Sequence, residues 1–223
     1  MKLEKGIIKE TFLDGSVRIE CPHELIPAPG QYLLAHANAS DAPLADPVFF
    51  SHSAPNGFVT APPTPNSWMP GTILNLRGPL GHGFAIPVAA RKIALIAFDD
   101  YPARLHGLIP LALNQNAEVV LLCDSQVNDL PEVVEVQPVK AMQDILLWAD
   151  YAAVDVSRGK VNQLREKIME QGHVRMRPEA QVLIRTQMPC GALAECGVCA
   201  VTIGHYWKMA CKDGPVFGLN ELL

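Results

Sequence analysis

The sequence lacks several features that define common protein classes. Only 18% of its 223 residues are charged and the net charge is -5, so no broad nucleic-acid-binding surface is expected. No apolar run reaches the length of a membrane span; the longest candidate, LHGLIPLAL, is far too short, so no membrane contact is expected. The start, MKLEKGIIKE, has no apolar core of a signal peptide. We therefore expect a cytoplasmic protein.

Cysteine is scarce over most of the chain and concentrated near its end. Four of the six cysteines lie between Cys190 and Cys211. Because thiols stay reduced in the cytoplasm, a disulfide cluster is disfavoured and metal binding is favoured. Cys21 and Cys123 fall in predicted strands, where a free cysteine packs as a small apolar side chain, so we interpret both as core thiols.

The first part of the chain reads as short strands. GIIKETFL and GSVRIEC are separated by Asp14-Gly15, a hairpin signal, and PGQYLLAHA, GFVTAPP and GTILNLRG supply further strands. Prolines are dense between Pro22 and Pro87, which argues against long helices there. Residues 1–88 are therefore predicted to form a small antiparallel barrel or sandwich.

The pattern changes after Arg91. The continuous apolar segments KIALIAF, AEVVLLCD, YAAVDVS and AQVLIRT read as buried strands. The helical candidates between them are ARLHGLIPLALNQ, MQDILLWAD and VNQLREKIMEQG, the last ending at Gly172. Strands that alternate with helices predict a doubly wound α/β domain over residues 89–186. The fold class expected is thus α+β multi-domain, with a cysteine module at residues 187–223.

The cysteine spacing is C-x5-C-x2-C-x11-C, over Cys190, Cys196, Cys199 and Cys211. Zinc ribbons usually bring two C-x2-C pairs, whereas one pair with two single cysteines is close to the plant-type [2Fe-2S] arrangement. The residues between the ligands are small, which lets backbone N–H groups approach cluster sulfides: Gly191, Ala192, Ala194, Gly197 and Ala200. A structural zinc and a set of buried thiols are the alternatives.

At this point the sequence resembles a known family. MPCGALAECGVCAV followed by KMACKDGPVF resembles the cluster-binding C-terminus of the dihydroorotate dehydrogenase electron-transfer (iron-sulfur) subunit family, within the ferredoxin-reductase superfamily. PGQY and RGPLGHGF resemble that family's third barrel strand and the glycine loop between its domains. The resemblance implies an FAD-binding barrel, a nucleotide-binding α/β domain of ferredoxin-reductase type and a C-terminal [2Fe-2S] module.

The resemblance also implies a function and its residues. Electrons would pass from NADH through FAD to the cluster and on to a flavin in a partner dehydrogenase subunit, in pyrimidine biosynthesis. The chain would be an electron-transfer subunit rather than a stand-alone enzyme, with no catalytic residue of its own; a homo-oligomer is left open. The implied cluster ligands are Cys190, Cys196, Cys199 and Cys211. The implied flavin-proximal loop is Gly78, Pro79, Leu80 and Gly81.

The sequence departs from the family in three places. The loop between the first two cysteines has five residues, where the family usually has four. Asp46 stands where the family places an arginine against the flavin phosphates, and a carboxylate repels pyrophosphate. After KIALIAF the chain has Asp99 and Asp100 in place of a glycine-rich phosphate turn, and YAAVDVSRG replaces a Cys-Gly-Pro turn. NAD is therefore not expected, and FAD is doubtful.

Three hypotheses follow from these patterns. The favoured one is a [2Fe-2S] electron-transfer subunit with altered or lost flavin and nucleotide sites. The second is the full FAD- and NADH-dependent subunit, and the third is a non-redox interaction protein with a structural zinc or cluster. We further expect Tyr206 and Trp207 to pack over the cluster loop. A docking surface is expected near the ligands, and two alternatives stay open for four apolar residues, which either belong to this surface or pack locally: Met188, Pro189, Leu193 and Val198.

Overall fold

A closed antiparallel barrel forms the N-terminal part of the computed structural model, which describes residues 2–38, 41, 44–99, 101–127, 129–169 and 179–223. Its order is β1-β2-β5-β4-β3-β6, so the prediction of a small antiparallel barrel is confirmed. The strands are β1 (Lys2–Thr11), β2 (Val17–Glu20), β3 (Tyr32–Ala37), β4 (Asp46–Ala54), β5 (Gly57–Thr60) and β6 (Ile73–Leu80), with a short 3-10 helix, η1 (His23–Leu25), after β2.

The barrel follows from alternation along its strands. In β6 every second residue is buried, as expected where one face of a strand meets a core. Ile8, Phe58 and Leu76 are among the fully buried side chains of this core. The Asp14-Gly15 turn joins β1 to β2 as predicted: the Asp14 carboxylate accepts a hydrogen bond from the Ser16 backbone N–H, and Gly15 has a φ of +83°.

The second part of the fold is built on a six-stranded sheet, in the order β14-β11-β10-β7-β8-β9. Its strands are β7 (Lys92–Ala97), β8 (Glu118–Leu122), β9 (Val134–Gln137), β10 (Tyr151–Ser157), β11 (Glu179–Arg185) and β14 (Val216–Gly218). All neighbours are parallel except β14, which is antiparallel to β11. The chain builds outward from β7 in both directions, so the topological switch point lies between β7 and β10.

Helices cover both faces of this sheet, which makes the domain doubly wound. In β7, Ile93 and Leu95 face the core that contains α1 (Leu108–Asn114). Ala94 and Ile96 face the core that contains α2 (Met142–Trp148) and α3 (Val161–Met169). Short 3-10 helices precede these elements: η2 (Pro102–Arg104), η3 (Val139–Ala141) and η4 (Arg158–Lys160). The predicted helix end at Gly172 lies outside the described residues.

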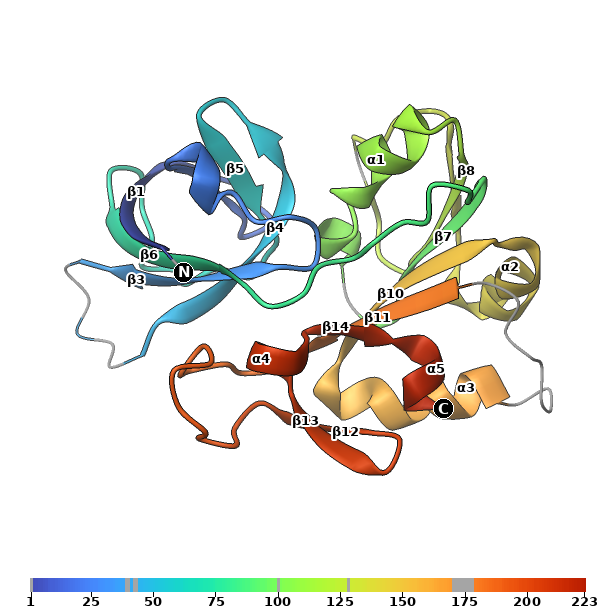
Figure 1. Cartoon of the computed structure of the whole chain (residues 1–223). Coiled ribbons are helices and arrows are strands. Elements are labelled where there is room, and N and C mark those ends of the chain that lie inside the picture. Colours follow the sequence, from blue (N-terminus) through green and yellow to red (C-terminus); the bar gives the residue numbers. More distant parts are fainter. Residues whose placement is uncertain (1, 39–40, 42–43, 100, 128, 170–178) are drawn as a thin grey trace.

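The C-terminal segment runs beneath both the barrel and the sheet (Figure 1). It forms a hairpin of β12 (Ala200–Ile203) and β13 (Tyr206–Met209), then α4 (Ala210–Asp213) and α5 (Leu219–Leu222). One hydrophobic core joins Tyr32 of the barrel, Val182 of the sheet and Cys199 of this segment. Because β14 belongs to the predicted cysteine module and also completes the sheet, the module shares structure with the α/β domain. No helix in the described ranges is long and apolar enough to span a membrane.

Candidate iron-sulfur site and the switch-point crevice

The four clustered cysteines form two pairs. The Cys190 and Cys196 sulfurs are 3.5 Å apart, and the Cys199 and Cys211 sulfurs are 3.2 Å apart. Two thiolates on one tetrahedral metal lie roughly 3.8 Å apart, so each pair is spaced to share one metal ion. Within the described part of the chain, no three His, Cys, Asp or Glu side chains gather around a single ion position. Two separate pairs suit the two irons of a [2Fe-2S] cluster better than one zinc ion.

The two pairs differ in exposure and in acidity. Cys196 is exposed and Cys190 is half-buried, whereas Cys199 and Cys211 are buried. Burial acts to raise the pKa of Cys190, but hydrogen bonds from the loop backbone and from Cys196 outweigh it and lower that pKa to about 7. Burial, followed by the neighbouring Cys199, raises the pKa of Cys211 to about 12. The module thus has an outer pair, Cys190 and Cys196, and an inner pair, Cys199 and Cys211.

The extra residue between the first two cysteines is absorbed in a tight turn. The Leu193 N–H donates to the Cys190 carbonyl at 3.1 Å, and the two central residues, Gly191 and Ala192, have φ values of +48° and +66°. Two successive positive φ values define a turn of the I′ kind, which glycine adopts freely and alanine does not. Gly191 is also essential for space, since a Cβ there would collide with Leu34 and the Arg77 guanidinium.

Side chains from the other two parts of the fold hold the loop backbone. Arg77 of β6 donates to the Cys190 carbonyl at 2.8 Å, and the buried Tyr32 hydroxyl of β3 donates to the Cys211 carbonyl at 3.2 Å. Arg158 of η4 donates to the Val198 carbonyl at 2.8 Å. Sequence reasoning missed all three residues, although Arg77 opens the RGPLGHGF motif. The loop therefore lies on a preformed support, and its residues fit a cluster.

The predicted flavin-proximal loop packs against the cysteine module. Leu80 is buried and pairs with Tyr32 in the barrel, while a Cβ on Gly81 would lie 2.5 Å from the Pro215 side chain. The next residue, His82, donates its backbone N–H to the Gly214 carbonyl at 2.6 Å. Gly78 and Pro79 lie at the end of β6. In this structure the loop therefore serves the contact between the barrel and the C-terminal segment.

The barrel strand expected to hold flavin phosphates is β4, and its described residues differ from the family pattern. Asp46 opens β4, and burial raises the pKa of its carboxyl. Further along β4, the Arg104 guanidinium of η2 lies 5.9 Å from the centre of the Phe49 ring. A Cβ on Gly107, at the start of α1, would lie 2.6 Å from the Phe50 ring. His52 also lies in β4 and is exposed. This strand thus carries a carboxylate, and not an arginine, at the position expected to meet flavin phosphates.

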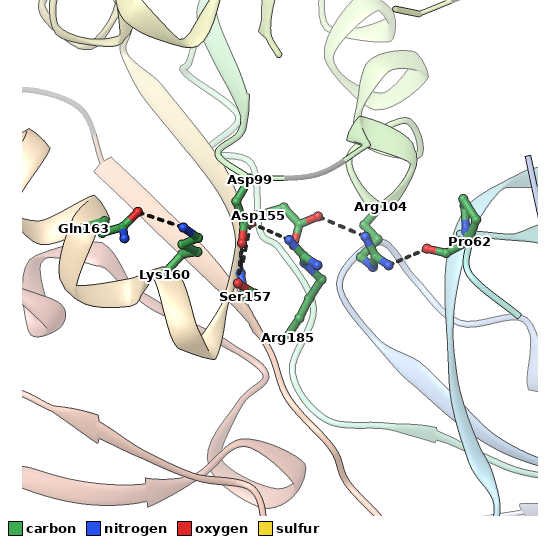
Figure 2. A network of polar contacts seen from close by, with 8 residues as sticks. All are labelled: Pro62, Asp99, Arg104, Asp155, Ser157, Lys160, Gln163 and Arg185. Atoms are coloured by element: carbon green, nitrogen blue, oxygen red, sulfur yellow. Dashed lines mark hydrogen bonds and ion pairs between the residues drawn. The ribbon is translucent and has the colours of Figure 1, made fainter. Parts of the chain in front are cut away.

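A network of charged side chains lies at the carboxyl ends of β7, β10 and β11, beside the switch point (Figure 2). It borders an open cavity of about 410 Å³ that Asp99 helps to line, and we call this region the crevice. Arg185 donates to Asp155 at 2.8 Å and to Asp99 at 2.5 Å. Arg104 donates to Asp155 at 3.4 Å. Asp99 also accepts hydrogen bonds from the backbone and hydroxyl of Ser157. Asp100 lies outside the described residues. We call Asp99, Arg104, Asp155 and Arg185 the crevice network.

One expectation about the surroundings of the cysteines is wrong, and for Met188 the structure favours local packing over a place in the docking surface. Tyr206 and Trp207 do not pack over the loop: both project from β13 and are 76% and 78% exposed. Met188 does not contribute to a surface because it is 1% exposed and belongs to the core, whereas Leu193 and Val198 are exposed. A four-residue strand in a two-stranded sheet leaves its aromatic side chains without a partner layer, which the sequence did not reveal.

The fold and the cysteine pairs together define a class: a chain of ferredoxin-reductase fold with a C-terminal iron-sulfur module. Residues 186–223 match the family model of the iron-sulfur cluster binding domain of dihydroorotate dehydrogenase B. The chain is similar to the electron transfer subunit of dihydroorotate dehydrogenase B (NAD(+)) from Desulforamulus reducens, with 29% identity over 174 residues. That alignment covers 66% of this chain and 64% of the relative, so just under two thirds of the relative's length is matched.

Solved structures agree on the fold. An NADH-dependent reduced ferredoxin-NADP oxidoreductase superposes with a TM-score of 0.71 at 18% identity, covering 97% of this chain and 88% of that one. The ferredoxin reductase of carbazole 1,9a-dioxygenase superposes with a TM-score of 0.62 at 16% identity, covering 81% and 68%. The first match extends over almost the whole chain, so the combination of barrel, α/β sheet and C-terminal segment recurs in a solved redox protein.

Proposed function

We propose that this chain is an electron-transfer subunit that holds a [2Fe-2S] cluster and exchanges electrons with a flavin-containing dehydrogenase partner. The observation that carries the proposal is the pairing of the thiols in a segment that matches an iron-sulfur binding domain. Cys190 and Cys196 would hold one iron, and Cys199 and Cys211 the other. The bound cluster supplies one-electron chemistry, while the chain positions it and sets its potential.

Support for an external partner comes from the exposure of the outer pair. Cys196 is exposed, and Leu193 and Val198 beside the ligands are 67% and 40% exposed. Apolar side chains in such a position suit the core of a transient protein contact. All six cysteines are free thiols, which agrees with the cytoplasmic setting we propose. The relative's name supports a dehydrogenase as the partner class.

Three points of the sequence analysis stay predictions within this proposal. The flavin-proximal role of Gly78, Pro79, Leu80 and Gly81 is supported only by the fold, and FAD is retained as an alternative cofactor on the same ground. The domain limits 1–88, 89–186 and 187–223 also stay predictions. The limits fall in the connections that follow β6 and β11. However, β14 lies in the third segment and pairs with β11 of the second.

A cofactor inventory tests the proposal. We expect anaerobically purified protein to contain two irons and two sulfides per chain, as a [2Fe-2S] cluster requires. One zinc with no iron would support the structural-metal alternative and refute the proposal. Stoichiometric FAD that NADH bleaches would instead support the full flavin-dependent subunit.

A further inference from the structure

The crevice network is balanced in charge, and two of its four side chains, Asp155 and Arg104, are buried. The Asp155 side chain is 1% exposed and that of Arg104 is 6% exposed. Burial raises the pKa of the Asp155 carboxyl, and the guanidinium groups of Arg104 and Arg185 oppose this rise. Two carboxylates face two guanidinium groups, so each charge has a partner of opposite sign. A buried pair of this kind needs no ligand to neutralise it.

The network stands where open α/β sheets bind their ligands. In such sheets a dinucleotide lies outside the carboxyl ends of the strands at the switch point, with its pyrophosphate on backbone N–H groups at a helix N-terminus. Here Asp99 follows β7 at once, and the first α-helix after it, α1, begins only at Leu108. The Asp99 carboxylate therefore occupies the side of the crevice that a phosphate would approach.

The same network connects the barrel with two neighbouring strands of the sheet. Arg104 also donates to the carbonyl of Pro62, in the barrel segment after β5, at 2.5 Å. Arg185 is the last residue of β11, five positions before Cys190. A continuous path of hydrogen bonds thus runs from the barrel, through Asp155 in the sheet, to the strand that enters the cysteine loop (Figure 2).

We infer that the crevice network stands in place of a dinucleotide and fastens the barrel to the neighbouring strands β10 and β11 of the sheet. Electrons reach or leave the cysteine module through a protein partner, and no reduced dinucleotide binds in the crevice. The electron route rests on the proposed function, whereas the closure of the crevice rests on the network alone.

A titration of the unmodified full chain tests the closure. We expect no binding of NADH or NADPH by isothermal calorimetry up to about 1 mM, the weak limit of ordinary specific binding. Binding of either dinucleotide at or below that concentration would overturn the inference. Iron-free protein that also fails to bind NADH would refute the proposed cluster and would still support the closed crevice. The proposed function and the inference about the crevice can therefore fail independently.

A variant tests the fastening role. In R104M, the amides of η2 and of the segment after β5 should exchange with deuterium roughly tenfold faster, since the bond to the Pro62 carbonyl and the pair with Asp155 are both lost. The control R18M removes the surface pair with Glu10 and should leave these amides unchanged. R104K keeps the positive charge but not the planar guanidinium, so its exchange rates should lie between those of R104M and R18M. R104K also serves as the test if R104M does not fold. Equal exchange rates in R104M, R104K and R18M would overturn the fastening role of Arg104.

Discussion

The cysteine loop and the crevice lie at two of the three places where the family resemblance implies a redox cofactor, and they are built from different residue types. The loop has small residues, positive φ values and backbone carbonyls held by Arg77, Tyr32 and Arg158. At the crevice, charged side chains bind one another. The difference teaches that one chain can support a loop through its backbone at one place and pair charged side chains with one another at another place.

The largest expected effect concerns the inner cysteine pair. C199S should remove iron from the purified protein almost completely, because it takes away a buried ligand that no other cysteine can replace. C123S, which changes a buried thiol at the end of β8, should keep its iron. Iron and sulfide assays with the visible spectrum measure both variants. A full iron content in C199S would contradict the assignment of this ligand.

The next effect concerns the crevice. D155N should lower the free energy of unfolding by about 3–5 kcal/mol, because two guanidinium groups then lose a buried carboxylate. For a chain of this length that corresponds to a fall in Tm of roughly 10 °C in calorimetry. E10Q, which weakens a surface pair with Arg18, should change Tm by no more than about 2 °C. Equal Tm values for D155N and E10Q would show that the crevice network does not stabilise the fold.

A smaller effect would link the barrel to the cluster. R77M should keep the cluster but make its reduction potential more negative by roughly 20–60 mV, because a positive charge that favours the reduced cluster is lost. R77K keeps this charge and should recover most of the potential, although it cannot reproduce the planar contact with the Cys190 carbonyl. Spectroelectrochemical titration checks both. A potential that stays unchanged in R77M would contradict a tuning role for Arg77.

The pH dependence of stability would sharpen the picture of the interface between barrel and sheet. Burial, helped by the nearby His52, lowers the pKa of His106 to about 4. Between pH 6.5 and that value the unfolded chain binds a proton that the folded chain does not. Stability should therefore fall as the pH falls, by up to about 1.4 kcal/mol per pH unit. In urea titrations the free energy of unfolding of H106Q should depend less on pH than that of the parent protein. The control H23Q should show the same pH dependence as the parent. Parallel curves for H106Q and the parent would contradict the burial of a neutral His106.

The smallest effect concerns the extra loop residue. A192G should raise stability by up to about 1 kcal/mol, because glycine adopts the φ of +66° without the strain that alanine carries. Iron content should be the same as in the parent. Thermal unfolding of the cluster-loaded protein measures the difference. A loss of stability larger than about 1 kcal/mol would show that the turn is not the one described.

Much of the fold could be predicted from patterns that are local in the sequence. The alternation of apolar and polar residues in GTILNLRG predicts a strand that is buried on one face. The continuous apolar run KIALIAF predicts a strand that is buried on both faces. The short strands β9, β12, β13 and β14 were missed, since three or four residues carry too little periodicity to detect.

The candidate site divides in the same way. Cys190, Cys196, Cys199 and Cys211 were predicted from spacing, because cluster ligands lie close in the chain. The contacts of Arg77 and Tyr32 with the loop join residues more than 100 positions apart, so no local pattern contains them. Asp99 was predicted to oppose phosphate, but its pairing with Arg185 depends on the order of β7, β10 and β11 in the sheet.

Electron paramagnetic resonance of the anaerobic, cluster-loaded chain tests the central claim most directly. The cluster is expected to be reduced by dithionite and to give the signal of a single unpaired spin per chain, while NADH alone gives none. A signal of equal intensity after NADH would show that the chain takes electrons from a dinucleotide by itself, and this would contradict the account of the crevice. A protein without any signal after dithionite would contradict the account of the cysteine loop.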